Sequence, residues 1–102
     1  MKGDWTMLES NFQSKLIKEI KERFPGCIVL KNDATYIQGI PDLSIFCKNH
    51  WAMLEVKKSK TASRQPNQEY YVNKANEMSF AKFVYPENKD EVLHGLAELF
   101  NN

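Results

Sequence analysis

The chain has 102 residues, of which 42% are hydrophobic and 26% are charged. This length fits one small domain, residues 1–102, and excludes a two-domain enzyme with a separate cofactor-binding fold. The composition is that of a folded globular protein, and no run approaches the roughly 20 apolar residues that span a bilayer. Fourteen basic and 13 acidic residues leave a net charge of +1. This balance argues against binding of nucleic acid through bulk charge, although it allows a locally basic surface.

The two cysteines, Cys27 and Cys47, each lie in an apolar run and form no Cys-x-x-Cys pair. A zinc site is therefore not expected. We interpret both cysteines as buried thiols in a reducing compartment. The first nine residues also lack the apolar segment of a secretory signal, so the sequence predicts a cytoplasmic location.

The first predicted element is an amphipathic helix. Apolar residues recur at every fourth position from Leu8 to Phe24, with Ile17 beside them. This is the helical period, and Pro25-Gly26 ends the helix. The apolar run 27–30 then predicts a strand, and the polar segment 31–39 predicts a loop or a frayed strand.

The middle of the chain predicts a β-hairpin. Two strand-like runs, 43–47 and 51–57, flank the compact polar turn Lys48-Asn49-His50. The polar and basic segment 58–65 follows as a loop.

The last third of the chain predicts a helix, a strand and a second helix. Pro66 fits the first turn of a helix, whose apolar stripe consists of Tyr71, Ala75 and Met78. Residues 80–85 form a strand, and residues 92–100 form the final amphipathic helix. The order α-β-β-β-α-β-α predicts an α/β fold with a mixed central sheet flanked by helices.

Two carboxylates and a lysine fall at one end of the predicted hairpin. Alternation along 51–57 places Glu55 and Lys57 on one face, with Val56 directed to the core. By itself this pattern fits a half-exposed strand. A turn centred near Asn49, however, puts Asp42 opposite residues 55–57, where facing Cβ atoms are roughly 4.5–5.5 Å apart.

Carboxylates this close repel one another unless positive charge lies between them. A divalent cation suits two hard oxygen ligands better than a lysine does. We therefore predict a metal site at Asp42 and Glu55, with the Val56 carbonyl as a third candidate ligand. Pro41 fixes its φ near about −65° and Gly39 permits an unusual backbone path, which together make a stiff approach to Asp42.

Two further polar residues border the predicted site. Glu9 lies beside the buried stripe of the first helix, so it either reaches the metal cluster or interacts favourably with the helix dipole. Gln68 heads the core-facing stripe of the second helix. It either orients a water or a phosphate or caps a backbone group, and the sequence favours neither.

The segment Gly39-Ile40-Pro41-Asp42, followed by Glu55-Val56-Lys57, resembles the PD-(D/E)xK nuclease superfamily, whose restriction-endonuclease-like core has the order α-β-β-β-α-β. More narrowly, the chain is similar to the virus-type replication-repair nuclease (VRR-NUC) domain over nearly its whole length. The shared features are Glu9 in the first helix, Gln-Pro-Asn-Gln at 65–68, and Phe83-Val84-Tyr85 before a short helix. Related exonucleases carry Gln-x-x-x-Tyr in the second helix, but here Val72 stands at the tyrosine position.

The resemblance implies metal-dependent endonucleolytic hydrolysis of DNA phosphodiester bonds. Asp42 and Glu55 would then hold Mg²⁺ or Mn²⁺ with Glu9 nearby, and Lys57 would position the attacking water. Stand-alone phage copies act as dimers on branched DNA such as Holliday junctions, which implies a junction resolvase in a phage-infected bacterial cell. The alternatives are a flap, nick or restriction-like nuclease, a non-catalytic DNA-binding module, and a structural protein with incidental surface carboxylates.

The basic loop after the second hairpin strand is the predicted DNA contact. Lys58, Lys60 and Arg64 lie in a stretch from Val56 to Gln68 that has no acidic residue. Basic and hydroxyl side chains of this kind suit phosphate oxygens, and Gln68 joins the same set. The alternative is a solvated loop.

A domain with one site has to pair with a second copy in order to cut two symmetric strands. The aromatic residues exceed what so small a core needs, so some of them are candidates for a homodimer surface: Trp5, Phe46, Trp51, Tyr70 and Phe100.

Overall fold

The computed structural model describes residues 2–101, and the side chains from residue 8 onward. The order of elements is the predicted one, with an additional 3₁₀ turn before the last helix. The elements are α1 (Lys2–Arg23), β1 (Ile28–Lys31), β2 (Leu43–Cys47), β3 (His50–Val56), α2 (Pro66–Met78), β4 (Ala81–Val84), η1 (Pro86–Asn88) and α3 (Lys89–Phe100).

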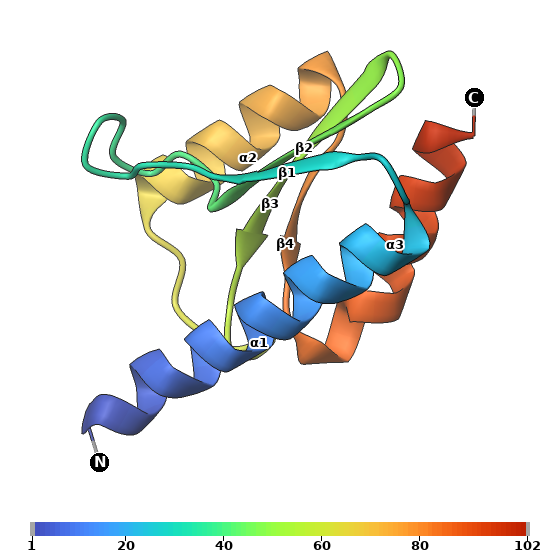
Figure 1. The fold of residues 1–102 in the computed structure, drawn as a ribbon. Coiled ribbons are helices and arrows are strands. Elements are labelled where there is room, and N and C mark those ends of the chain that lie inside the picture. The colour runs from blue at the N-terminus through green and yellow to red at the C-terminus, as the bar shows by residue number, and fades with distance from the viewer. Residues whose placement is uncertain (1, 102) are drawn as a thin grey trace.

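The strands of the described chain form one four-stranded sheet in the order β1-β2-β3-β4 (Figure 1). β1 pairs with β2, and β2 with β3, in antiparallel fashion, whereas β4 runs parallel to β3. The sheet is therefore mixed, as predicted. A parallel pair needs a long crossover connection, which α2 supplies between β3 and β4.

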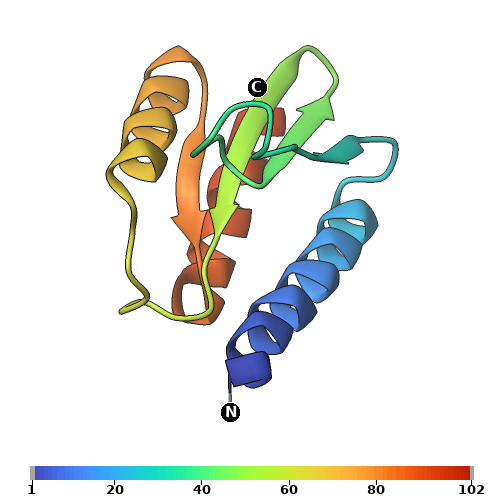
Figure 2. The same cartoon turned by 90° about the vertical axis from the view of Figure 1, so that its left-hand side faces the viewer.

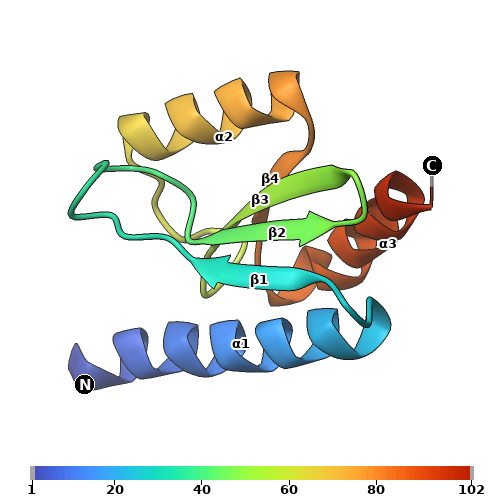
Figure 3. The same cartoon turned by 45° about the horizontal axis from the view of Figure 1, so that its top comes forward.

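The helices cover the sheet from both sides. Figure 3 shows α2 on one face and α1 with α3 on the other, and Figure 2 shows α1 and α2 at opposite sides of the sheet. The main core lies between the sheet and the α1–α3 layer, where Leu16, Leu54 and Leu93 are fully buried. On the α2 face a smaller cluster gathers around Val72, Ala75 and Ala81. The site described below lies at one end of this second layer.

Two residues assigned to buried helical stripes are exposed instead. Leu8 is 57% exposed, because the first part of α1 extends past the sheet and its core contacts begin at Phe12 (Figure 3). Met78 is also exposed, and Val72 rather than Met78 shares the buried side of α2 with Ala75. In both helices the period is right, and the position of the sheet decides which part of the stripe is covered.

The interpretation of the cysteines as two thiols is wrong, because Cys27 and Cys47 form a disulfide. Ile28 faces Phe46 across the β1–β2 pair, so the residues one step outward also face each other, with their Cα atoms 4.5 Å apart. That separation lies within the range that a disulfide spans. A sequence separation of 20 residues hides this proximity until the pairing of β1 with β2 is known.

The aromatic residues divide between core and surface. Phe100 is buried and packs edge-to-face on Phe24, so it is a core residue rather than part of a dimer surface. Phe46 and Tyr70 are exposed, Trp51 is half-buried, and the side chain of Trp5 lies outside the described part. Within residues 2–101, no helix has both the length and the apolar character that crossing a bilayer requires.

Candidate active site

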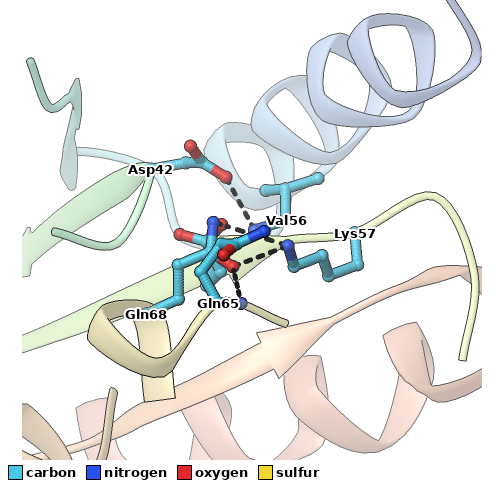
Figure 4. A network of polar contacts seen from close by, with 6 residues as sticks. Asp42, Val56, Lys57, Gln65 and Gln68 are labelled. Atoms are coloured by element: carbon cyan, nitrogen blue, oxygen red, sulfur yellow. Dashed lines mark hydrogen bonds and ion pairs between the residues drawn. The ribbon is translucent and has the colours of Figure 1, made fainter. Parts of the chain in front are cut away.

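The hairpin brings Asp42 to the end of β3, as predicted. Leu43 faces Leu54 in the β2–β3 register, so the next position outward places Asp42 opposite Glu55. The backbone N–H of Val56 donates a hydrogen bond of 2.9 Å to Oδ2 of Asp42, and Figure 4 shows the two residues side by side. The Asp42 carboxylate is thereby directed at the strand that carries Glu55.

The chain segment before Asp42 is held rigidly by the close packing of Gly39. This residue has a φ of +91°, and a Cβ placed on it would lie 2.7 Å from Cγ of Asn67. The loop before Asp42 therefore packs directly against the first turn of α2, where only glycine fits. Pro41, which follows, is fully buried.

Glu55 and Lys57 lie on the same face and are both buried, with exposed fractions of 4% and 9%. The interpretation of this face as a half-exposed strand surface is therefore wrong. The first turn of α2 covers this end of β3 and contributes Gln68 to the same cluster (Figure 4). A charged pair at this depth needs specific polar partners.

Gln68 supplies those partners through its amide group. Its Oε1 accepts hydrogen bonds of 2.9 Å from Nζ of Lys57 and from the backbone N–H of Gln65. Its Nε2 donates a bond of 3.1 Å to Oε2 of Glu55, which lies 3.9 Å from the Lys57 ammonium. The capping interpretation of Gln68 is confirmed, and the same amide also links the two buried charged groups.

Glu9 faces the cluster from α1. It is half-buried, and the charges of Asp42, Lys57 and Lys58 act on it. The helix dipole does not explain its position, because α1 begins at Lys2 and the dipole acts mainly within the first turn. Of the two interpretations of Glu9, the structure favours proximity to the acidic cluster.

The chain resembles two solved structures in its overall fold. One, described as "VRR_NUC domain protein", aligns with a TM-score of 0.67 and 15% identity, covering 91% of this chain and 88% of that one. The other, described as "VRR_NUC domain", aligns with a TM-score of 0.61 and 22% identity, covering 79% and 92%.

This chain has the VRR-NUC fold. No protein-family model matches the sequence, and no curated protein does either. The likeness therefore lies in the tertiary arrangement, and it extends over most of the chain.

In this VRR-NUC fold the carboxyl groups of Glu9, Asp42 and Glu55 all have raised pKa values, with burial as the main cause. Burial raises the pKa of Glu55 from 4.5 to about 8, and the nearby carboxylates of Asp42 and Glu9 add to the shift, against the opposing effects of Lys57 and the Asp42 backbone amide. Burial also raises the pKa of Asp42, although the Val56 N–H and Lys57 lower it. The pKa of Glu9 is raised by burial and by Asp42.

This donor set fits a hard divalent cation. Within the described residues no three acidic, histidine or cysteine side chains form a complete metal site on their own. Magnesium, however, is commonly bound by one or two carboxylates and keeps several waters. The half-buried Asp42 and the buried Glu55 provide that number of carboxylate ligands, and a cation between them would favour the ionised form of both.

The predicted DNA-binding residues border the site to different degrees. The charge of Lys58 lowers the pKa of Glu9. Lys60 is exposed, and its backbone N–H donates a hydrogen bond of 3.3 Å to Oε1 of Glu87. The guanidinium of Arg64 lies 3.9 Å above the ring of Phe83, whose partner in the β3–β4 register is Glu55. Arg64 also lines a hollow of about 270 Å³ between α2 and β4. The basic loop thus runs along the edge of the acidic cluster.

Sequence reasoning missed Asn32 and Ser44. The Nδ2 group of Asn32 donates hydrogen bonds to the Pro41 carbonyl at 2.9 Å and to the Ser44 hydroxyl at 2.8 Å. One signal was available, because Ser44 is the polar residue in the apolar run 43–47. A hydroxyl in such a strand needs a partner, although the sequence does not say which residue provides it.

Proposed function

We propose that this protein is a metal-dependent deoxyribonuclease that cuts phosphodiester bonds within branched DNA, in the manner of a junction resolvase. One observation carries the proposal: in a VRR-NUC fold, the half-buried carboxylate of Asp42 lies opposite the buried carboxyl group of Glu55, beside a lysine that is held by the same amide as Glu55. This combination places carboxylate oxygens that can bind a cation beside a positive charge held in a fixed position.

Asp42 and Glu55 would hold Mg²⁺ or Mn²⁺, with the Val56 carbonyl and Glu9 as further candidate ligands. When bound, the cation lowers the pKa of a coordinated water and offsets charge on the phosphate oxygens. Glu55 is buried and Asp42 is half-buried, so bulk water has limited access to this position. Charge interactions there are stronger than at an exposed site.

Lys57 contributes a positive charge whose place is set before DNA binds. Gln68 accepts a hydrogen bond from its ammonium, which leaves other donor hydrogens of the same group for a water or a phosphate oxygen. A preorganised cation of this kind stabilises charge that develops in the transition state. We assign Lys57 to orienting the attacking water.

Lys58, Lys60 and Arg64 are proposed to contact the DNA backbone. Contacts of this type position a duplex without reading its sequence. Gln68 was predicted among these DNA contacts, but its amide already serves Glu55, Lys57 and the Gln65 backbone. We therefore assign Gln68 to holding the catalytic pair.

A homodimer is proposed because two symmetric cuts require two sites. Exposed apolar side chains support an interaction surface on the open part of the sheet, where Ile28 and Phe46 face each other across β1 and β2. Light scattering of the intact protein tests this part. A monomeric mass together with paired cutting would contradict it.

The proposed activity is tested by incubating the full chain with labelled four-way junctions, flaps, nicked duplex and linear duplex. We expect Mg²⁺- or Mn²⁺-dependent cutting, strongest on the junction, that a chelator stops and added metal restores. Preferred cutting of flaps or nicks would favour that alternative nuclease class. Binding without any cutting would contradict a nuclease and leave a DNA-binding module.

A further inference from the structure

Asn32 makes hydrogen bonds to Asp42 and to residues on both sides of it. It is the first residue after β1, and its backbone N–H donates to the Asp42 carbonyl at 2.8 Å. Its side-chain amide bonds the Pro41 carbonyl on one side of Asp42 and the Ser44 hydroxyl on the other. Residues 41, 42 and 44 are therefore all held by the same asparagine.

Ser44 completes this arrangement from within β2. It is 5% exposed, and its hydroxyl donates back to Oδ1 of Asn32 at 3.1 Å. A buried and a half-buried polar side chain that satisfy one another in this way restrict the backbone that carries them. The bonds of Ser44 thus fix the start of β2 relative to the end of β1.

Asp42 needs such support because no strand holds it and another carboxyl group lies opposite it. It lies in a bend before β2, outside the regular ladder, and opposite the buried carboxyl group of Glu55. The hydrogen bond from Val56 holds the carboxylate itself, but this bond is correctly placed only if the backbone at Asp42 stays fixed. The contacts of Asn32 provide that fixed backbone.

We infer that Asn32, together with Ser44, is a positioning pair that holds Asp42 in its cation-binding place. The catalytic consequence rests on the proposed function, whereas the structural consequence does not. A positioning residue behind a metal ligand typically changes affinity or activity by about 10- to 100-fold when it is lost. We expect an effect of that size for Asn32→Ala.

The first test uses the metal-free protein. The Val56 amide reports on the Asp42 carboxylate because it donates to it, so its ¹⁵N shift and hydrogen exchange are measured by NMR. In Asn32→Ala we expect exchange at Val56 to rise about tenfold or more, while the Lys57 amide, which donates to Val84, keeps its protection. An unchanged Val56 amide would overturn the inference.

The matched control is Asp33→Ala. Asp33 is the next residue along the chain and is exposed, and its carboxylate bonds Thr35 rather than the Asp42 region. This variant changes the same loop but leaves the contacts to residues 41–44 intact. A Val56 response equal to that of Asn32→Ala would point to general loosening of the loop and would also overturn the inference.

The second test measures metal binding and turnover. Mn²⁺ titration calorimetry on the full chain should show affinity weakened about 10- to 100-fold in Asn32→Ala, with kcat reduced and KM for DNA unchanged. Ser44→Ala removes both bonds between the Ser44 hydroxyl and the Asn32 amide but leaves the bond to the Pro41 carbonyl, so it should shift the same quantities in the same direction by less. Ser44→Ala serves as the second variant where Asn32→Ala does not fold, and wild-type Mn²⁺ affinity in it would then overturn the inference.

The two proposals fail in different ways. If Asp42→Ala cuts DNA like the wild type, the proposed function is wrong, while the response of Val56 to Asn32→Ala is still decisive for the positioning role. If Asp42→Ala is inactive but Asn32→Ala matches the wild type in Val56 exchange, Mn²⁺ affinity and kcat, only the positioning role is wrong.

Discussion

Two acidic groups of this molecule have comparable partners but opposite electrostatics. Glu19 on α1 accepts a bond of 2.9 Å from Lys89 of α3 and lies 2.8 Å from Arg23, and these cations lower its pKa. Glu55 has Lys57 at 3.9 Å, yet burial and neighbouring carboxylates raise its pKa to about 8. Two cations balance the Glu19 carboxylate, whereas Glu55 shares Lys57 with Asp42 and Glu9.

The difference separates a structural ion pair from a candidate reaction site. At Glu19 the charges are matched within the chain, so the pair is complete and ties two helices together. At Glu55 burial and neighbouring carboxylates make a negative charge costly, so the folded chain favours the protonated form. Perturbation of this kind is typical of functional sites, where a ligand supplies the missing charge.

The largest expected difference is in catalysis. Asp42→Ala or Glu55→Gln should reduce junction cutting by at least about 100-fold, because each variant removes an oxygen ligand that the proposed mechanism requires. Glu19→Gln is the matched control and should cut like the wild type. Circular dichroism and DNA-binding titrations check that the inactive variants still fold and bind. Full activity in either variant would exclude the proposed roles.

The next largest difference is in the pH dependence of stability without metal. The pKa of Glu55 is higher in the folded protein, so folding favours its protonated form and stability falls as pH rises from about 4.5 through 8. The slope from this group is at most about 1.4 kcal/mol per pH unit. Glu55→Gln should flatten the curve and exceed the wild type in stability at pH 8. Urea unfolding at several pH values measures this, and identical curves would contradict the assigned shift.

The smallest effect is expected at the Glu19 ion pair, where stability changes with pH in the opposite direction. Because the pKa of Glu19 is lowered in the folded protein, its stabilising contribution is present above about pH 4.5 and is lost as pH falls through the folded-state value. Glu19→Gln should cost less than about 1 kcal/mol at pH 7, since solvent still screens this half-buried pair. The same urea series measures it. A loss that grew as pH fell would contradict this explanation.

The site was predictable to the extent that it is local in the sequence. Asp42 and Glu55 belong to one hairpin, so turn position and strand alternation were enough to place them together. The depth of Glu55 was not predictable, because it depends on α2 folding back over the end of β3. The pairing of Asn32 with Ser44 and the Cys27–Cys47 disulfide were missed for a related reason, since both depend on β1 lying beside β2.

The sequence by itself determined the order of the elements, the presence of the hairpin and the meeting of Asp42, Glu55 and Lys57, because short-range periodicity and turn chemistry control these features. Only the tertiary structure decided which faces are covered, which carboxylates lose their solvent and which side chains hold them. Burial and the pKa shifts that follow from it depend on every element packed around a group, including elements far away along the chain.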